Sequence, residues 1–222
     1  MVTVGIVGSG NIGSTVARLA VAAGHGVVLS NSRGPDTLRS LVDELGAKAR
    51  AATPTEAAAD GDLVLISIPL KAYANLSDLS VAGKIVMDTG NYYPQRDGRI
   101  PQLETKMLTD TEYLLSFLPG CEITKVFNNI FFKHLRNLAR PVGHSERSAL
   151  PVAGDSSRAK AAVRELLDTI GYDAVDSGGL AEGWRQQPGT PVYATPYGSF
   201  DDESGTPAGA EVIRAALAAA TR

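Results

Sequence analysis

The sequence predicts an α/β fold, in which an open, mainly parallel sheet carries helices on both faces and a small C-terminal α/β extension follows. Short apolar runs without polar alternation, such as 62–69 and 84–88, are typical of strands buried on both faces. Helical patterns separate such runs through about residue 140, as expected for a doubly wound sheet. The composition, 44% hydrophobic and 20% charged, is that of an ordinary globular protein.

The first strand and the first helix enclose a glycine motif. The apolar run 2–7 leads directly into Gly8-Ser9-Gly10-Asn11-Ile12-Gly13, and an alanine-rich helical pattern over about 12–23 follows. In this context Gly8 permits a tight turn, Gly10 lets a pyrophosphate approach the backbone, and Gly13 lets the helix pack on its strand. The helix N-terminus also attracts phosphates. The motif therefore predicts a Rossmann-type dinucleotide site rather than a purely structural turn.

The segments that follow continue the alternation. A strand over 26–30 ends in a polar turn, and a second helix begins near Pro35. Thr53-Pro54-Thr55-Glu56 is typical of a capped helix start. Further strands are predicted at 48–52, 62–69, 83–88 and 122–127.

The last third of the chain forms a further unit. Strands predicted at 149–153 and 172–175 flank a helix over 156–170, and a final helix covers about 207–220. Segment 178–207 is rich in Gly and Pro, and we expect an ordered loop because it contains aromatic residues, namely Trp184, Tyr193, Tyr197 and Phe200. The sequence thus predicts a dinucleotide-binding domain over 1–140 and a small part over 141–222 that covers the substrate or mediates dimerisation.

Charge and cysteine content limit the partners. The formal net charge is −3 and no basic block is present, which argues against nucleic acid. No stretch approaches the ~20 apolar residues of a membrane span, and no basic leader precedes the first strand. The single Cys121 cannot form an internal disulfide and suits a reducing compartment. We expect a cytoplasmic protein that binds small molecules rather than membranes.

The turn after the second strand favours NADP(H) over NAD(H). An NAD site usually has an acidic residue about 20 positions past the glycines, at the end of this strand. Asn31, Ser32 and Arg33 occupy that position, and the first carboxylate is Asp36. A carboxylate would repel a 2′-phosphate, whereas Ser32 can donate a hydrogen bond to it and Arg33 can add a charged fork.

The carboxyl ends of the later strands indicate where the nicotinamide would lie. These ends are 67–71, 88–94 and 127–130, which present small, apolar or amide groups. Asn91 and Asn128 are candidates to bind ribose hydroxyls or a carboxamide, although Asn also caps helices and turns.

Acid and base candidates are scarce. His25, His134 and His144 have no patterned partner, so structural or surface roles are favoured, and we assign no catalytic residue and no metal ligand. Hydride transfer between two rings needs mainly close, oriented faces. A carbonyl or hydroxyl substrate would need a proton donor, and Lys71, Tyr92 or Tyr93 keep that alternative open.

Several segments, in one order and spacing, resemble the NADPH-dependent 8-hydroxy-5-deazaflavin (coenzyme F-420) reductases, to which the cytosolic domain of membrane metalloreductases is similar. The resemblance covers almost the whole chain. It is carried by 8–13, 31–33, Ile68-Pro69, Asp88-Thr89-Gly90-Asn91-Tyr92-Tyr93, Val126-Phe127-Asn128-Asn129 and Gly178-Gly179-Leu180-Ala181-Glu182-Gly183-Trp184.

The resemblance implies NADP(H) as cofactor, an 8-hydroxy-5-deazaflavin co-substrate stacked over the nicotinamide, and a homodimer. Carried over by position, Ser9, Gly10, Asn11 and Ile12 would line the pyrophosphate. Ser32 and Arg33 would hold the 2′-phosphate, and Ile68, Pro69 and Asn128 would border the nicotinamide. The expected function is hydride transfer between NADPH and a deazaflavin or flavin-like acceptor. The alternatives are an NADPH-dependent reductase of a small carbonyl or imine, and a non-catalytic NADP(H)-binding sensor.

Overall fold

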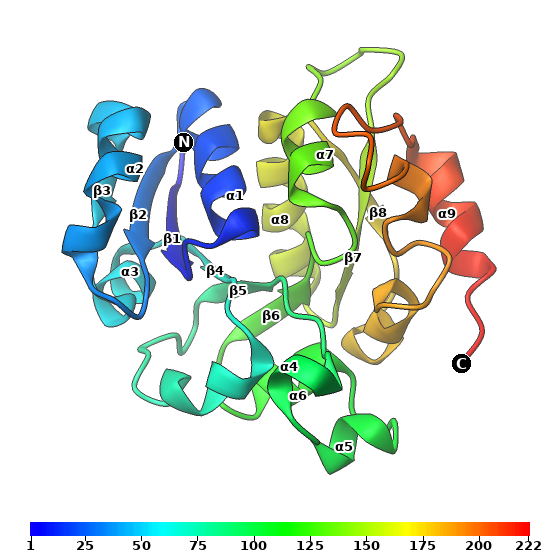
Figure 1. Cartoon of the computed structure of the whole chain (residues 1–222), viewed down its shortest axis with the longest axis horizontal. Coiled ribbons are helices and arrows are strands. Elements are labelled where there is room, and N and C mark those ends of the chain that lie inside the picture. Colours follow the sequence, from blue (N-terminus) through cyan, green and yellow to red (C-terminus); the bar gives the residue numbers. More distant parts are fainter.

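A computed structural model describes residues 1–222, and it confirms the predicted α/β fold. One eight-stranded sheet has the order β3-β2-β1-β4-β5-β6-β7-β8 (Figure 1). All neighbouring strands are parallel except β6 and β7, which run antiparallel. The order of the first six strands is that of a Rossmann fold, whose switch point lies between β1 and β4.

The strands are short, and all but the edge strands β3 and β8 are largely buried. Their bounds are β1 Thr3–Val7, β2 Gly26–Ser30, β3 Ala49–Ala51, β4 Leu63–Ile66, β5 Ile85–Asp88, β6 Glu122–Lys125, β7 Ala149–Gly154 and β8 Asp173–Asp176.

The helices vary widely in length. Their bounds are α1 Asn11–Ala22, α2 Arg39–Leu45, α3 Pro54–Asp60, α4 Pro94–Asp97, α5 Pro101–Glu104, α6 Asp110–Leu115, α7 Phe132–Asn137, α8 Ser157–Ile170 and α9 Ala210–Ala218.

Most predicted elements recur with ends shifted by a few residues. The strand predicted over 26–30 coincides with β2. The predicted cap of α3 is present as a capping box, in which Thr53 Oγ1 accepts a hydrogen bond from the Glu56 amide and the Glu56 carboxylate accepts one from the Thr53 amide. The helix predicted over 156–170 is present as α8, and its apolar face is buried. That face consists of Ala159, Val163, Leu166, Leu167 and Ile170.

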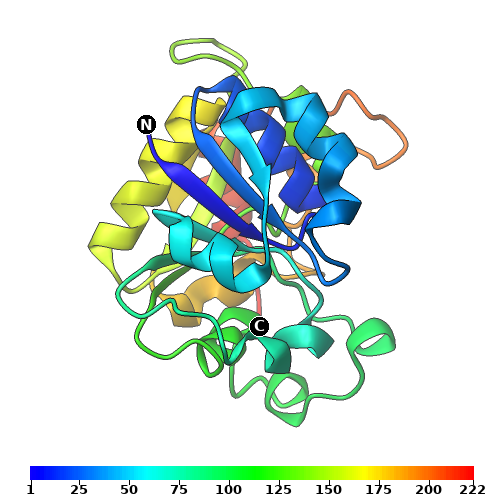
Figure 2. The same ribbon diagram turned by 90° about the vertical axis from the view of Figure 1, so that its left-hand side faces the viewer.

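The sequence did not predict the short helices α4, α5 and α6, and for α7 it predicted only that His134 could lie on a helix. Each has between four and six residues, which is too short to display a 3.6-residue period. Figure 2 shows the first three gathered below the sheet, beyond the carboxyl ends of the parallel strands. Segment 178–207, expected to be an ordered loop, contains 3-10 turns at Leu180–Gln186 and Thr195–Tyr197.

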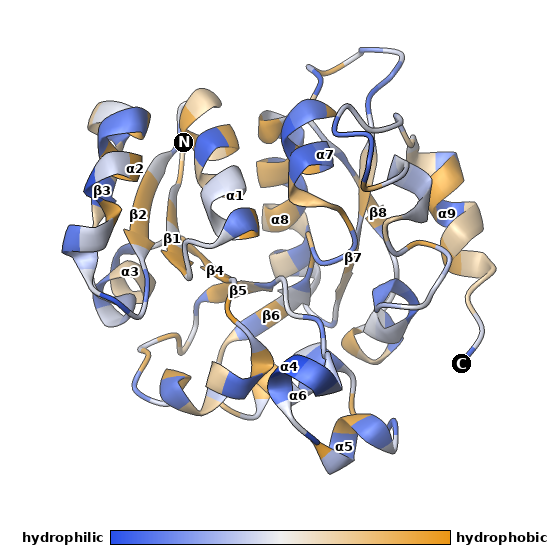
Figure 3. Cartoon of the chain, viewed as in Figure 1, coloured by the Kyte–Doolittle hydropathy of each residue, from blue (hydrophilic) through white to orange (hydrophobic).

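The apolar core lies on the two faces of the sheet. The larger cluster joins β1 and β2 to α1, α8 and α9, and the smaller one joins β4 and β5 to α3, α6 and the 3-10 turn over Leu70–Leu76. In Figure 3 the strands are mostly hydrophobic, whereas outward-facing parts of the surrounding helices are hydrophilic. None of the helices combines the length and the apolar character that a membrane crossing requires.

The boundary predicted near residue 140 falls between α7 and β7. The sheet continues across it, since Lys125 of β6 pairs with Ala153 of β7. One core cluster also includes residues from both sides, such as Val16 and Val163. The division into two parts stays a prediction, and the structure shows that these parts share one sheet and one core.

Candidate functional site

The loop between β1 and α1 leaves no room for side chains at two of its glycines. Gly8 has a φ of +105°, and a Cβ there would lie 2.3 Å from the Ser67 carbonyl oxygen. A Cβ on Gly13 would lie 2.0 Å from the Gly8 carbonyl oxygen. At Gly10, by contrast, a Cβ would meet nothing within 4 Å. Gly8 and Gly13 therefore serve packing, and Gly10 faces open space.

The N-terminus of α1 faces the same space. No side chain caps its first turn, which contains no acidic residue. Free amide groups and the positive end of the helix dipole are well suited to phosphate groups. The backbone around Gly10, Asn11 and Ile12 thus fits the pyrophosphate of a dinucleotide.

On one side of the glycine loop lies a pocket of about 340 Å³, which we call the Arg33 pocket. Ser32 and Arg33 line it and are exposed, and no hydrogen bond engages either side chain. Asn31 instead shapes the turn, because its Oδ1 accepts a hydrogen bond from the Arg33 amide at 2.8 Å. Asp36 lies outside the lining and forms an ion pair with Arg39 at 2.7 Å. The pocket therefore presents a free cation and no carboxylate.

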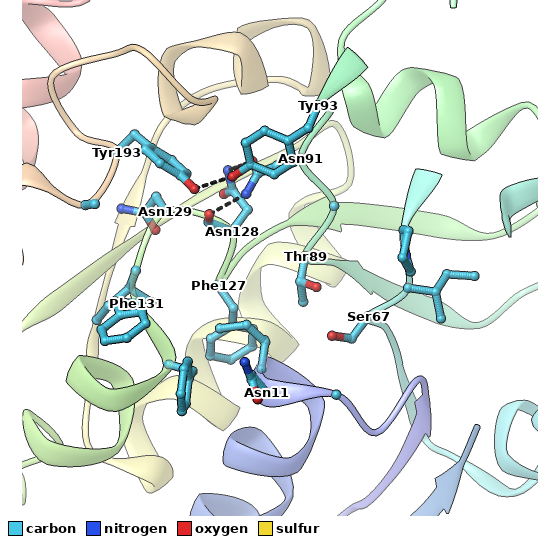
Figure 4. A pocket seen from close by; sticks show the side chains of 18 of the residues that line it. Asn11, Ser67, Thr89, Asn91, Tyr93, Phe127, Asn128, Asn129, Phe131 and Tyr193 are labelled. Carbon is cyan, nitrogen blue, oxygen red and sulfur yellow. Dashed lines mark hydrogen bonds between the residues drawn. The ribbon is translucent and has the colours of Figure 1, made fainter. Parts of the chain in front are cut away.

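On the other side of the glycine loop lies the main pocket, of about 500 Å³. It shares Gly10, Ser67, Ile68 and Pro69 with the Arg33 pocket, so the two pockets adjoin at the loop, and we call the pair the channel. Its far wall is aromatic, as Figure 4 shows for the labelled part. The aromatic residues that line it are Tyr93, Phe127, Phe131, Phe132, Tyr193 and Phe200.

The two candidate asparagines line the main pocket but are bonded to the chain. Asn91 Nδ2 donates to the Asn128 carbonyl at 2.7 Å, and Asn128 Nδ2 donates to Asn91 Oδ1 at 2.9 Å (Figure 4). Asn128 Nδ2 also donates to the Gln186 carbonyl at 2.6 Å, and Gln186 Nε2 donates to Asn128 Oδ1 at 3.0 Å. Their direct contact with a ligand stays a prediction, and the geometry favours a role in holding the pocket wall.

Asn129 was not among the predicted site residues. It is fully buried and lines the main pocket, with Nδ2 donating to the Val192 carbonyl at 3.1 Å. Its Oδ1 has no hydrogen-bond partner. A buried acceptor without a partner is costly unless a ligand or water satisfies it. The pair Asn128-Asn129 at a strand end could have marked Asn129 as a site candidate. The sequence does not reveal that its Oδ1 lacks a hydrogen-bond partner.

Two tyrosines close the main pocket from opposite sides. The hydroxyls of Tyr93 and Tyr193 hydrogen-bond to each other, although 100 residues separate them in the sequence (Figure 4). Burial raises the pKa of Tyr93, and the bond to Tyr193 adds to this effect. Tyr92 faces away, accepting a hydrogen bond from the Ile100 amide at 3.0 Å, and Lys71 is exposed outside the lining. Of the predicted donors, only Tyr93 reaches the main pocket.

The aromatic loop 178–207 divides its residues between framework and pocket. Tyr197 is fully buried and donates to the Ala149 carbonyl at 2.8 Å. Trp184 lies outside the main pocket, beneath the guanidinium of Arg185 at 4.5 Å from the ring centroid. Only Tyr193, Ala194 and Phe200 of this loop contribute to the pocket lining.

A buried charged cluster supports the loop that carries Asn91 and Tyr93. Lys125 is completely buried, with Nζ 3.8 Å from carboxylate oxygens of both Asp88 and Asp110. Nζ also donates to the Gly90 carbonyl at 2.7 Å, and Asp88 accepts a hydrogen bond from the Gly90 amide at 2.7 Å. This cluster holds the backbone that lines the main pocket. Sequence reasoning missed it because Lys125 lies within an otherwise apolar strand pattern.

The remaining candidates have structural roles. His25 is buried, and its Nε2 hydrogen-bonds to Thr169 Oγ1 at 2.8 Å, outside both pockets. His134 is buried, with Nε2 bonded to the Asp202 carbonyl at 2.7 Å. Burial raises the pKa of Cys121 to about 11, so its reactive thiolate is disfavoured at neutral pH.

Comparison with known proteins identifies related sequences and folds. A family model described as "NADP oxidoreductase coenzyme F420-dependent" matches residues 3–92. The chain is 31% identical over 180 residues to metalloreductase STEAP3 from Rattus norvegicus, a match that covers 80% of the chain and 34% of that protein. The chain therefore spans about a third of the length of this curated relative.

Two solved structures are similar over most of the chain. The hypothetical protein SMa0349 from Sinorhizobium meliloti has 32% identity and a TM-score of 0.76, covering 87% of this chain and 94% of that one. A structure from Arthrobacter sp. FB24, with the provisional description F420-dependent NADP-reductase, has 23% identity and a TM-score of 0.68. That match covers 82% of this chain and 87% of the other, and it shows a shared fold.

Replacing Lys125 with Met should destabilise the protein strongly. The change leaves Asp88 and Asp110 buried without their cation, and at pH 7 we expect a loss of about 3–5 kcal/mol in the free energy of unfolding. Burial raises the pKa of Asp110 and Lys125 opposes that rise, so the variant should raise it further. The deficit should therefore shrink as the pH falls toward the pKa of Asp110.

Urea unfolding at several pH values measures this deficit. Lys160→Met is the matched control, because Lys160 pairs with the more exposed Asp176 at 2.8 Å, and its loss should cost less than about 1 kcal/mol. Equal deficits in the two variants would contradict a supporting role for the buried cluster.

Proposed function

Because this chain belongs to the family of NADP oxidoreductases described as coenzyme F420-dependent, we propose that it transfers a hydride between NADPH and a deazaflavin or flavin-like acceptor. The observation that carries the proposal is the pair of adjoining pockets on the two sides of the glycine loop. One end presents Ser32 and Arg33 without a carboxylate, and the other is an aromatic pocket. Such a channel suits a 2′-phosphorylated dinucleotide that meets a second planar ring.

The residues that would hold the dinucleotide can be assigned in order, from its 2′-phosphate to its nicotinamide. Arg33 and Ser32 would bind the 2′-phosphate, and the amides at the start of α1 would bind the pyrophosphate. Ile68 and Pro69, which line both pockets, would border the nicotinamide half. When bound, the nicotinamide supplies or accepts the hydride.

The chain's contribution to the reaction would be orientation and exclusion of water. The charged or phenolic side chains in the main pocket are Tyr93, Tyr193 and Arg96. Arg96 is engaged, since its guanidinium donates to the Asn91 carbonyl at 2.6 Å and lies 4.9 Å from the centroid of the Tyr93 ring. An aromatic wall and few ionisable groups suit ring-to-ring transfer, in which distance and orientation dominate.

The tyrosine pair supports a second candidate, reduction of a small carbonyl or imine. In a hydrogen-bonded pair of phenols one hydroxyl donates to the other, which leaves one O–H free for a ligand. Burial and the mutual bond raise the pKa of Tyr93, so its hydroxyl keeps its proton at neutral pH. A third candidate, a non-catalytic NADP(H) sensor, would bind the dinucleotide without turnover on any acceptor.

Replacing Arg33 with Ala should weaken NADPH far more than NADH. Loss of a charge-assisted contact to the 2′-phosphate should raise the dissociation constant for NADPH by about 10- to 100-fold. The constant for NADH should change by less than about twofold, because it has no such phosphate. Fluorescence titration measures both, with Arg39→Ala as the control of equal charge. Equal losses for NADPH and NADH would refute this assignment.

Turnover with defined acceptors should separate the candidate reactions. Purified protein with NADPH should bleach 8-hydroxy-5-deazariboflavin or FMN, and Tyr93→Phe should lower kcat by less than about tenfold, since no proton transfer limits ring-to-ring transfer. For a carbonyl or imine substrate, the same variant should lower kcat by about 10²- to 10⁴-fold. Tight NADPH binding without turnover on any of these acceptors would instead support the sensor.

We also propose a homodimer. This proposal rests on the resemblance to the NADPH-dependent deazaflavin reductases, which implies a dimer. Light scattering of the purified protein should give about twice the 23.2 kDa mass of one chain. A mass equal to one chain at all accessible concentrations would rule this out.

A further inference from the structure

A third cavity, which is polar and has a volume of about 500 Å³, lies between the N-terminal half of α1 and α7. We call it the cationic groove, because three cations, Arg18, Lys133 and Arg136, line it against one carboxylate, Glu203. Phe132 is its only hydrophobic lining residue. The two helices lie side by side in Figure 1, and α7 is hydrophilic along much of its length in Figure 3. Nothing in the dinucleotide assignment uses this groove.

The cations of the groove differ in how far they are neutralised. Arg18 is bound by Glu44 through hydrogen bonds of 2.6 and 2.8 Å. Lys133 forms an ion pair with Glu203. Arg136 is exposed and forms neither a hydrogen bond nor an ion pair, although its charge helps Arg18 to lower the pKa of Glu44. The groove therefore keeps an excess positive charge, concentrated at Arg136.

The groove adjoins the main pocket. Asn11 and Phe132 line both cavities, so a ligand with its ring against the aromatic wall can extend a chain past them toward Arg136. The alternative cation at the main pocket, Arg96, is already bound by the Asp97 carboxylate at 2.8 Å. Arg136 is thus the better available partner for a negative charge.

We propose that the cationic groove binds the anionic tail, a phosphate or carboxylate, of the hydride acceptor whose ring lies in the main pocket. The inference rests on the proposed function, and it narrows the acceptor class to rings that carry a flexible, negatively charged chain. Guanidinium groups suit this task because they bind phosphate and carboxylate oxygens through paired N–H groups. Ser14, beside Asn11 in the lining, can add a hydroxyl donor.

Riboflavin and FMN test the groove directly, because they share one ring and differ in a terminal phosphate. We expect the NADP⁺-loaded protein to bind FMN about tenfold more tightly than riboflavin, as one partly exposed charge-assisted contact would give. Arg136→Gln should reduce this preference to about twofold, and Arg136→Glu should abolish or reverse it. Riboflavin and NADPH should bind both variants as they bind the wild type. Flavin fluorescence titration measures all of these constants.

Arg164→Gln is the matched control, since Arg164 is exposed on α8 and lines neither cavity. It should leave the preference for FMN unchanged. Inorganic phosphate should compete with FMN and not with riboflavin if the tail site is the groove.

Three outcomes would overturn the inference. The first is equal affinity for FMN and riboflavin in the wild type, including the absence of binding for both. The second is an unchanged preference in Arg136→Gln. The third is a loss of NADPH affinity in that variant, which would assign the groove to the dinucleotide.

Turnover separates the groove proposal from the proposed function. Reduction of both flavins with equal KM supports the proposed function and contradicts binding of the acceptor's tail in the groove. A preference for FMN in binding, without reduction of any flavin or deazaflavin, supports the groove and contradicts the function.

Discussion

The structure depends on backbone-to-backbone packing where β1, α1 and β4 meet. Gly8 leaves no space between its own Cα and the Ser67 carbonyl, and Gly13 leaves none between α1 and the Gly8 carbonyl. Any larger residue would push the helix or the neighbouring strand away, since a packed interior cannot yield by an ångström without losing other contacts. This close approach places the start of α1, with its free amides, at the switch point of the sheet. The channel for the dinucleotide follows from that crossing.

A second constraint holds the acceptor end of the channel. Lys125 of β6 binds the Gly90 carbonyl after β5, and Asn128 after β6 binds both Asn91 and the Gln186 carbonyl. Three segments that are distant in sequence are thereby tied together by buried hydrogen bonds. Buried polar networks of this kind specify one arrangement, because every unpaired group would be costly. The amides that look like ligand contacts in the sequence therefore form much of the pocket's frame.

The two ends of the channel differ in the property that would select a ligand, which is charge at one end and shape at the other. Under the proposed function, selectivity at the Arg33 pocket would come from charge complementarity with a phosphate, through the exposed side chains of Ser32 and Arg33. At the main pocket, the shape of the aromatic wall and the tyrosine pair would decide which ring fits and how it is oriented. The cationic groove beyond Phe132 adds a third element, in which selection would depend on the charge of the acceptor's tail. If the proposed function holds, different parts of the molecule select the dinucleotide and the acceptor.

The sequence by itself determined the fold class, most of the strands and long helices, and the position of the glycine loop. These signals are local: an apolar run, a 3.6-residue period, a cap such as Thr53–Glu56, and a turn at 31–33 without a carboxylate at its strand end. Only the tertiary structure decided that Asn91 and Asn128 bond to each other, that Tyr93 meets Tyr193 across the pocket, and that Lys125 is buried beneath Gly90. The reason is physical, since these contacts join segments between 35 and 100 residues apart, and no local pattern encodes which of several polar side chains will be brought together. The acceptor site is built almost wholly from such contacts, which is why the sequence predicted the dinucleotide end in more detail than the pocket opposite it.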